Sequence, residues 1–157
     1  TVSWDQFAQC VDIKSPVKLP ESYKNMPNVL KIYDSHDSGS DGTPIQDSYD
    51  GDYNTRWSIS GTDAWGIYDL GSVKALDKVM IAYHQGDRRV ARFSIALSED
   101  GENYTTVIED ASTSGKTLEL ESYDLGGSKA RYVKFLGRGN SSNSWNSITE
   151  IVFIEKK

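Results

Sequence analysis

The stretch that decides the fold is Phe93-Ser94-Ile95-Ala96-Leu97-Ser98-Glu99-Asp100-Gly101. Its first five residues alternate large apolar side chains with small ones, which is the period of a β-strand that buries one face. The Asp-Gly pair that ends the stretch favours a tight hairpin turn. Residues 104–108 then have the composition of a returning strand, so the sequence predicts an antiparallel hairpin here.

Similar short stretches lie on both sides of this hairpin, separated by turn signals. They are residues 29–33, 65–70, 75–83, 117–121, 131–136 and 148–154. No helical periodicity of useful length and no βαβ alternation interrupts them. Turn signals at this spacing are typical of all-β sandwiches and jelly rolls. The sequence therefore predicts an all-β fold of about eight short strands, either a sandwich or a jelly roll.

Residues 1–28 read differently from the rest of the chain. Residues 4–11 have the pattern of a short amphipathic helix with Ser3 as its N-cap. Pro16, Pro20 and Pro27 then break any regular element. We expect residues 1–28 to be a lead-in or linker segment and residues 29–157 to form the sandwich domain.

Length and composition exclude several classes of function. The chain has 157 residues, enough for one domain with a substantial core, and its formal net charge is −6. That charge argues against nucleic acid or an anionic membrane as the main partner. No apolar run approaches the roughly 20 residues that span a bilayer. Cys10 is the sole cysteine, so an internal disulfide framework is excluded.

An acidic loop is the best candidate for a metal site. Asp47, Asp50, Asp52 and Thr55 fall within nine residues, with Gly51 where the backbone must turn. Oxygen ligands on a tight loop suit a hard cation such as Ca²⁺, although the spacing is not that of an EF-hand. The alternative is a solvated acidic turn, because Asp, Asn and Gly dominate turns in general.

Catalysis is not favoured by the residues present. The two histidines, His36 and His84, lie in separate loops, and neither sits in a recognisable nucleophile motif. Most of the Asp and Glu residues lie in turns and in the acidic loop, where solvated or structural roles are the default. Acidic pairs are plentiful, so composition alone leaves a two-carboxylate glycosidase open. A free-standing hydrolase or lyase would need a convergent set of catalytic groups, and none is recognisable in the sequence.

Two other loops have the composition of a sugar-binding site. Residues 83–89 and 137–147 combine aromatic, amide and guanidinium groups. The candidate ligand-binding residues are Tyr83, His84, Gln85, Arg88, Arg89, Arg138, Asn140, Trp145 and Asn146. Sugars offer apolar C–H faces and many hydroxyls, which such groups recognise, and arginine adds recognition of carboxylates. The alternative is a pair of polar surface loops with the Trp145 ring packed on the rim of the core.

The ordered motifs of the chain resemble a known family. They are Asp50-Gly51-Asp52-x-x-Thr55-Arg56-Trp57, Trp65-x-x-Tyr68-Asp69-Leu70-Gly71, Phe93-x-Ile95-x-x-Ser98-x-Asp100-Gly101, Ala130-Arg131-Tyr132-Val133 and Ile148-Thr149-Glu150-Ile151. Over about residues 29 to 155 the chain resembles the discoidin, or coagulation factor 5/8 type C, domain family. More narrowly, it is similar to family 32 of carbohydrate-binding modules, and most similar to modules attached to alginate lyases.

The resemblance implies an eight-stranded, discoidin-like jelly-roll β-sandwich with a structural calcium ion and a glycan site. For calcium it implies the side chains of Asp50 and Thr55, the carbonyls of Asp47 and Asp52, and Glu150 near the C-terminus. For the glycan it implies a His followed five residues later by an Arg, together with an Asn and a stacking aromatic. His84 and Arg89 have that spacing, and Asn140 and Trp145 are the counterparts of the other two.

The resemblance also implies a role and a location. It implies a non-catalytic module that targets an appended polysaccharide-degrading enzyme to its glycan, in a secreted or cell-surface bacterial protein. Arg88 and Arg138 add positive charge that a neutral sugar does not require, so we expect alginate or its oligosaccharides as the ligand. The alternatives are a galactose- or galactosamine-type glycan, or a discoidin-like adhesion role with protein or lipid headgroups as partners.

Overall fold

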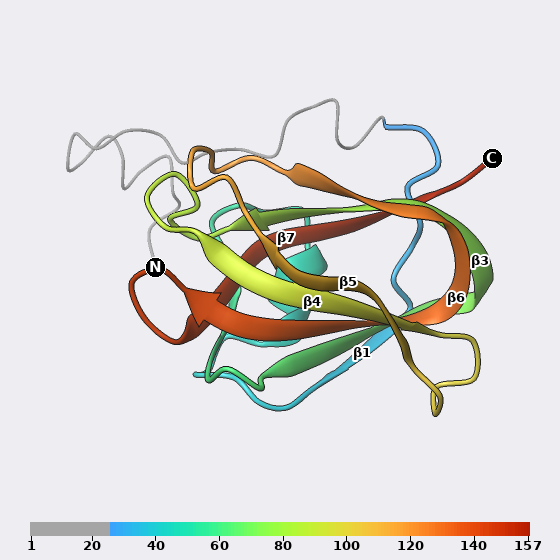
Figure 1. Ribbon diagram of the computed structural model, residues 1–157, viewed down its shortest axis with the longest axis horizontal. Coiled ribbons are helices and arrows are strands. Elements are labelled where there is room, and N and C mark those ends of the chain that lie inside the picture. The colour runs from blue at the N-terminus through green and yellow to red at the C-terminus, as the bar shows by residue number, and fades with distance from the viewer. Residues whose placement is uncertain (1–25) are drawn as a thin grey trace.

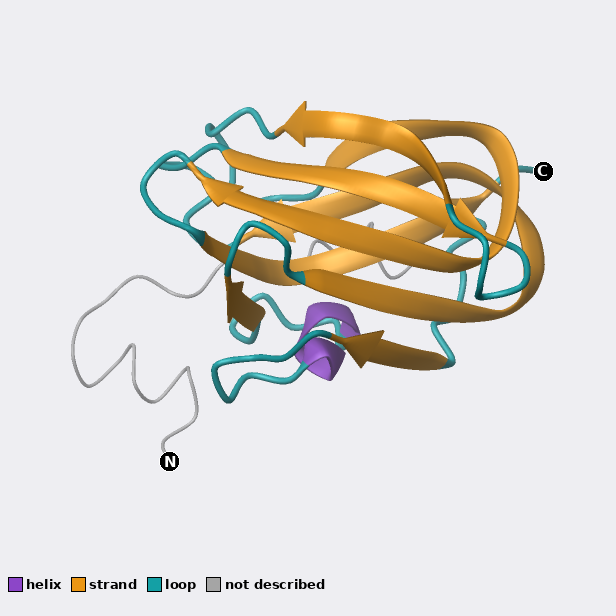
Figure 2. Cartoon of the chain, turned by 60° about the horizontal axis from the view of Figure 1, so that its bottom comes forward, coloured by secondary structure: helices purple, strands orange, loops and turns teal. Residues whose placement is uncertain are grey.

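The computed structural model describes residues 26–157, which form two packed layers of antiparallel strands (Figure 1). In chain order the elements are β1 (Asp34–Asp37), the 3₁₀-helix η1 (Ile45–Tyr49), β2 (Trp57–Ser60), β3 (Trp65–Tyr83), β4 (Ala91–Ser98), β5 (Thr105–Ser112), β6 (Glu121–Asn140) and β7 (Trp145–Glu155). Figure 2 shows η1 packed beside the strands as the single helical element of these residues. None of the helical structure within residues 26–157 has the length and hydrophobicity to cross a membrane.

The two long strands, β3 and β6, run through both layers. The first half of β3 pairs with β1, and its second half pairs with β7. The second half of β6 pairs with β4, which pairs in turn with β5, while β2 joins the other layer through β7. The jelly-roll sandwich is thus confirmed, with seven strands in place of the eight expected. Residues 65–70 and 75–83 form one strand, and two expected strands that are absent are offset by β1 and β2, which were not expected.

The bend in β3 explains why the sequence suggested two strands, residues 65–70 and 75–83, where there is one. Gly71 lies at the bend with φ +86°, a conformation that glycine adopts without strain. A Cβ atom at this position would lie 2.6 Å from the ring of Tyr33. The chain therefore turns from one layer into the other without leaving the sheet.

Aromatic side chains from both layers fill the core. Trp57, Tyr68, Phe93, Phe135 and Phe153 are all fully buried. Burial of such large apolar surfaces is the main stabilising contribution to a sandwich of this kind. The core holds β2, β3 and β7 in place, and the loops at their ends form the site described below.

The predicted hairpin at residues 93–108 is confirmed, as strands β4 and β5. Gly101 has φ +82° in the turn between them. The Asp100 carboxylate accepts hydrogen bonds from the backbone N–H groups of Glu102 and Asn103, both at 2.9 Å. These bonds close the turn that the Asp-Gly pair predicted.

The prediction of a strand at residues 29–33 is wrong, and the strand in this region is β1, which begins at the next residue. Leu30 N–H donates to the carbonyl of Phe153 in β7, whereas Tyr33 N–H donates to that of Asp69 in β3. The segment thus passes from one layer to the other and completes no ladder in either. Just before it, the carbonyl of Asn28 accepts a hydrogen bond of 2.9 Å from Glu155 N–H.

The strand expected at residues 117–121 is also wrong, because β6 begins only at Glu121. Thr117 Oγ1 instead accepts a hydrogen bond from Glu119 N–H at 3.0 Å, which closes a local turn. Leu120 packs against the cluster of Tyr53 and Ala82, so an apolar residue of the alternating pattern is partly buried without belonging to a strand. The helix expected at residues 4–11 lies outside the described residues, and the boundary at residue 28 stays a prediction.

Candidate functional site

The turn at residues 83–89 positions one histidine and two arginines after β3. The carbonyl of Gln85, a residue with φ +55°, accepts hydrogen bonds from Arg88 N–H at 2.9 Å and Arg89 N–H at 3.0 Å. His84 N–H donates to the carbonyl of Ser147 at 3.0 Å, which fastens the turn to β7. The Arg89 guanidinium donates to the His84 carbonyl at 3.3 Å, so Arg89 is held against His84.

The loop between β6 and β7 is organised by the amide of Asn140. Its nitrogen donates to the Asn143 side chain and to the Trp145 carbonyl, both at 2.8 Å. Its oxygen accepts from the backbone N–H groups of Ser142 at 2.8 Å and Asn143 at 3.0 Å. Trp145, at the end of this loop, is 37% exposed, so part of its indole is free to contact a ligand.

The structure brings these two loops together. One small pocket of about 10 Å³ lies between them. Its lining residues are Tyr83, His84, Arg89, Ala91, Asn140, Trp145 and Ser147. Four of the predicted ligand-binding residues that are distant in sequence, His84, Arg89, Asn140 and Trp145, therefore meet at one place on the surface.

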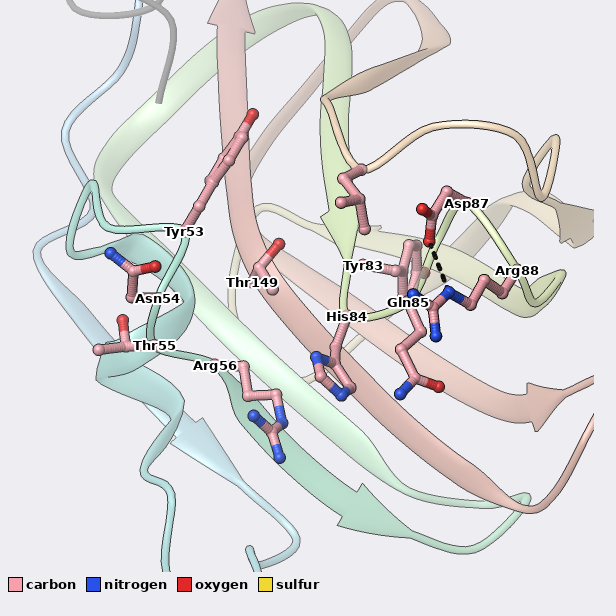
Figure 3. Close-up of a pocket in the computed structure, with 11 residues that line it drawn as sticks. Tyr53, Asn54, Thr55, Arg56, Tyr83, His84, Gln85, Asp87, Arg88 and Thr149 are labelled. Carbon is pink, nitrogen blue, oxygen red and sulfur yellow. Dashed lines mark ion pairs between the residues drawn. The ribbon is translucent and has the colours of Figure 1, made fainter. Parts of the chain in front are cut away.

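A larger open cavity of about 370 Å³ adjoins the same histidine (Figure 3). Its lining residues are Tyr53, Asn54, Thr55, Arg56, Tyr83, His84, Gln85, Asp87, Arg88, Leu118 and Thr149. The predicted residues Tyr83, His84, Gln85 and Arg88 form one side of it. The opposite side comes from residues 53–56, which are the end of the acidic loop and the residue after it.

Three guanidinium groups give this region a positive charge in a protein whose formal net charge is −6. Partial burial lowers the pKa of His84, and the charges of Arg56, Arg89 and Arg88 lower it further. The imidazole is therefore neutral at neutral pH. Burial and the neighbouring Arg56 likewise lower the pKa of Arg89. An anionic ligand bound here would relieve the repulsion among these cations.

Two predicted ligand-binding residues lie elsewhere. The Arg138 guanidinium donates to the Thr62 carbonyl at 3.1 Å and to the Asp63 carboxylate at 3.4 Å. Asn146 is 3% exposed and ties three backbone segments together. Its amide nitrogen donates to the carbonyls of Ile59 and Gly61, and its oxygen accepts from Gly139 N–H at 2.8 Å. Neither residue lines either cavity of the site.

The acidic loop gathers oxygen atoms around the Thr55 hydroxyl. This hydroxyl donates to the Asp50 carboxylate and lies 3.4 Å from the Asp47 carbonyl and 3.1 Å from the Asp52 carbonyl. The pKa of the Asp47 carboxyl is raised by burial and by repulsion from Asp50 and Asp52. A cation among these residues would offset that repulsion.

Glu150, the distant ligand implied by the resemblance, reaches the same loop. Its side chain is fully buried, and its carboxylate accepts a hydrogen bond from Gly51 N–H at 3.0 Å. No group of three or more His, Cys, Asp or Glu side chains that could hold a metal is found within residues 26–157. A cation here would therefore depend on carbonyl and hydroxyl oxygens as well, and an all-oxygen set fits calcium.

One side of the large cavity was not predicted from the sequence. Arg56 and Thr149 both line it, but neither was predicted as a ligand-binding residue. Thr149 sits at an irregularity in the pairing of β7 with β3, where Ala82 pairs with Glu150 and Tyr83 with Ile148. Such bulges commonly redirect a side chain beside a functional site. Arg56 lies in the motif of residues 50–57, directly after the acidic loop. That position was the only indication in the sequence that Arg56 could reach the site.

The chain matches one family model and several modules of carbohydrate-active enzymes. The F5/8 type C domain model matches residues 31–151. The family 32 module of AlyQ, solved in complex with 4,5-unsaturated mannuronic acid, is 39% identical with a TM-score of 0.78, over 82% of this chain and 98% of that one. A second structure of AlyQ, 38% identical with a TM-score of 0.77 over 82% of this chain, contains this module together with alginate lyase domains, and this chain covers 34% of it.

Two further relatives extend the pattern. A pectin-binding carbohydrate-binding module is 29% identical with a TM-score of 0.76, over 79% of this chain and 91% of that one. The polysaccharide lyase 8 family protein HylA of Enterococcus faecalis is 32% identical over 87 residues, which are 55% of this chain. The match spans only 6% of the length of HylA.

Proposed function

Because the chain belongs to the F5/8 type C domain family, and within it to family 32 of carbohydrate-binding modules, we propose that it binds an anionic polysaccharide built of uronate residues. Such modules are non-catalytic and occur attached to polysaccharide lyases and glycoside hydrolases. Alginate and its oligosaccharides are the proposed ligand. A relative at 39% identity binds an unsaturated mannuronic acid, and the relative at 29% binds pectin.

The observation that carries the proposal is the meeting of His84, Arg89, Asn140 and Trp145 at one small pocket. The exposed part of the Trp145 indole offers a platform for the C–H face of a sugar ring. Arg89 offers a guanidinium to a carboxylate. Neutral His84 donates or accepts a hydrogen bond with a hydroxyl. Together these groups match the three kinds of surface that a uronate presents.

Calcium is proposed as a structural ion of the acidic loop. Asp47, Asp50, Asp52 and Thr55 supply oxygens within one loop, and Glu150 brings a buried carboxylate to it. When bound, the ion would neutralise these acids and hold the loop to β7. It would have no part in sugar chemistry, because the proposed ligand contacts come from other residues.

The wider setting is proposed from the bacterial relatives. HylA comes from Enterococcus faecalis and is a polysaccharide lyase many times longer than this chain. We infer that this module is part of a longer, secreted or cell-surface bacterial enzyme and brings its catalytic domain to the polymer. Several modules or sites on one polymer would increase avidity without new contacts.

Titration calorimetry tests the choice of ligand. The protein is titrated with oligomannuronate, with galacturonate oligomers and with galactose, in the presence of calcium. Selective binding of oligomannuronate is the expected result, with micromolar to millimolar affinity because a shallow site buries little area. Trp145→Ala should abolish this binding and leave the melting temperature unchanged. Binding of galactose alone, or of no sugar, would refute the proposal.

A further inference from the structure

We propose that the 370 Å³ cavity between residues 53–56 and the turn at 83–89 is a second sugar subsite, in which Arg56 binds the carboxylate of the neighbouring uronate residue. The inference rests on the proposed function, because it extends the same bound chain by one residue. It assigns a ligand-binding role to Arg56, Thr149 and Leu118, which lie outside the small pocket.

Continuity of the two cavities is the first argument. The small pocket, at about 10 Å³, has room for about one water molecule, so it is too small to enclose a sugar ring. Tyr83 and His84 line both cavities. A sugar chain that leaves the small pocket past His84 therefore enters the larger cavity.

The charge of Arg56 is the second argument. Its Nε donates to Ser58 Oγ at 3.1 Å, and it takes part in no ion pair within the described part of the chain. Arg88, across the cavity, already has the Asp87 carboxylate 3.9 Å from its Nε. Figure 3 shows the Arg56 guanidinium and the His84 imidazole extending toward the same side of the cavity. Of the two arginines that line the large cavity, Arg56 is thus the one with no carboxylate at ion-pair distance among the described residues.

The lining of the cavity is the third argument. The hydroxyl of Thr149 is buried and has no hydrogen-bond partner, an arrangement that is costly unless something fills it. Thr149 itself is 7% exposed, and the irregular pairing of β7 places it in the cavity wall. Tyr53 and Leu118 supply apolar surface beside it. A few polar groups on an apolar wall are typical of a ligand pocket.

The experiment measures affinity as a function of ligand length. Mannuronate oligomers of one, two and three residues are titrated into the wild-type protein, Arg56→Gln and Thr149→Val. We expect the wild-type affinity to rise about tenfold from one residue to two, the size of one charge-assisted contact. Arg56→Gln should remove that gain and change monosaccharide affinity less than about threefold. Thr149→Val keeps the side-chain volume and should lower only the affinity for the longer oligomers.

Controls separate the subsite from general electrostatics and from the proposed function. Arg92→Gln removes a charge from an exposed arginine that is paired with Asp110, and it should leave every affinity unchanged. If the wild-type affinity does not depend on length, or if Arg56→Gln weakens all oligomers equally, the second subsite is refuted while the proposed function stands. If no mannuronate binds at all, both are refuted.

Discussion

The Glu150 carboxylate accepts a hydrogen bond from the backbone N–H of Gly51 across 99 positions of sequence. This bond joins the acidic loop to β7, one residue after Thr149 in the cavity wall. The loop in turn carries Arg56. One buried carboxylate therefore links the proposed calcium site to the proposed sugar subsite, and the two are expected to respond together.

Removal of calcium should lower the thermal stability of the protein. An ion held at about 100 times its Kd adds about 2.7 kcal/mol to the free energy of unfolding. For a domain of this size that corresponds to a fall of about 8 °C in melting temperature on chelation. Scanning calorimetry with calcium and with excess chelator checks this. Glu150→Gln should melt at nearly the same temperature in both, and a chelator-insensitive melt of metal-free wild-type protein would contradict the proposal.

Arg89 and Arg138 should differ in their effect on binding, although the sequence suggested both. Arg89→Ala removes a guanidinium from the small pocket and should weaken oligomannuronate binding at least tenfold, about the loss of one charge-assisted hydrogen bond. Arg138→Ala removes a group engaged with Thr62 and Asp63 and should leave the affinity within about twofold. Titration calorimetry of the Arg89→Ala and Arg138→Ala variants measures the two losses of affinity. An equal loss of affinity in the two variants would show that Arg138 also contributes to ligand binding.

Asn146→Ala should destabilise the fold without a direct effect on ligand contacts. The substitution leaves one N–H and two carbonyls without their partner, and we expect a loss of about 3 kcal/mol in the free energy of unfolding. Gly137 fits against this amide, where a Cβ atom would collide with it. Denaturant unfolding measures the loss. The exposed Asn103→Ala serves as a control and should cost less than about 1 kcal/mol.

Affinity for a uronate ligand should increase as the pH falls. Burial and three arginines hold the pKa of His84 below its ordinary value of 6.5 in the free protein. A bound carboxylate raises that pKa, so the complex takes up protons before the free protein does. Binding should therefore be tighter at pH 5.5 than at pH 7.5, and His84→Gln should abolish the difference. A pH-independent affinity of the wild type would show that no carboxylate lies near His84.

The same shift has the opposite sign for stability. The unfolded chain has the higher His84 pKa, so it binds a proton first as the pH falls. The stabilising contribution of neutral His84 is complete above pH 6.5 and is lost as the pH falls below it. Free protein should therefore become less stable over the range in which ligand affinity increases.

The elements predicted correctly are those that local chemistry specifies. The alternation at residues 93–97 and the Asp-Gly turn after it each need only a few neighbouring residues. Residues 117–121 alternate just as clearly, yet their apolar side chains cover Tyr53 and the large cavity. Periodicity identifies which side chains are buried, but it does not say whether another strand or a loop buries them.

In the candidate site, too, local spacing predicted some residues, whereas others depend on the tertiary structure. His84 and Arg89 stand in one turn, so their spacing predicted their proximity. Arg56 reaches the site only because β2 pairs with β7, and β7 with β3. That proximity depends on the tertiary arrangement of three strands, for which the sequence has no short-range signal.

The hydrogen bond between Glu155 and Asn28 has a consequence for how the module is carried. Glu155 pairs beside Leu76 and Ile148 beside Tyr83, so the bond lies seven residues along β3 from the His84 turn, about 23 Å. The chain thus enters and leaves the sandwich at neighbouring points on one side, and the loops proposed to bind the sugar lie at the other (Figure 1). A domain joined to the sandwich at either point would lie on the side opposite the loops that are proposed to bind the polymer.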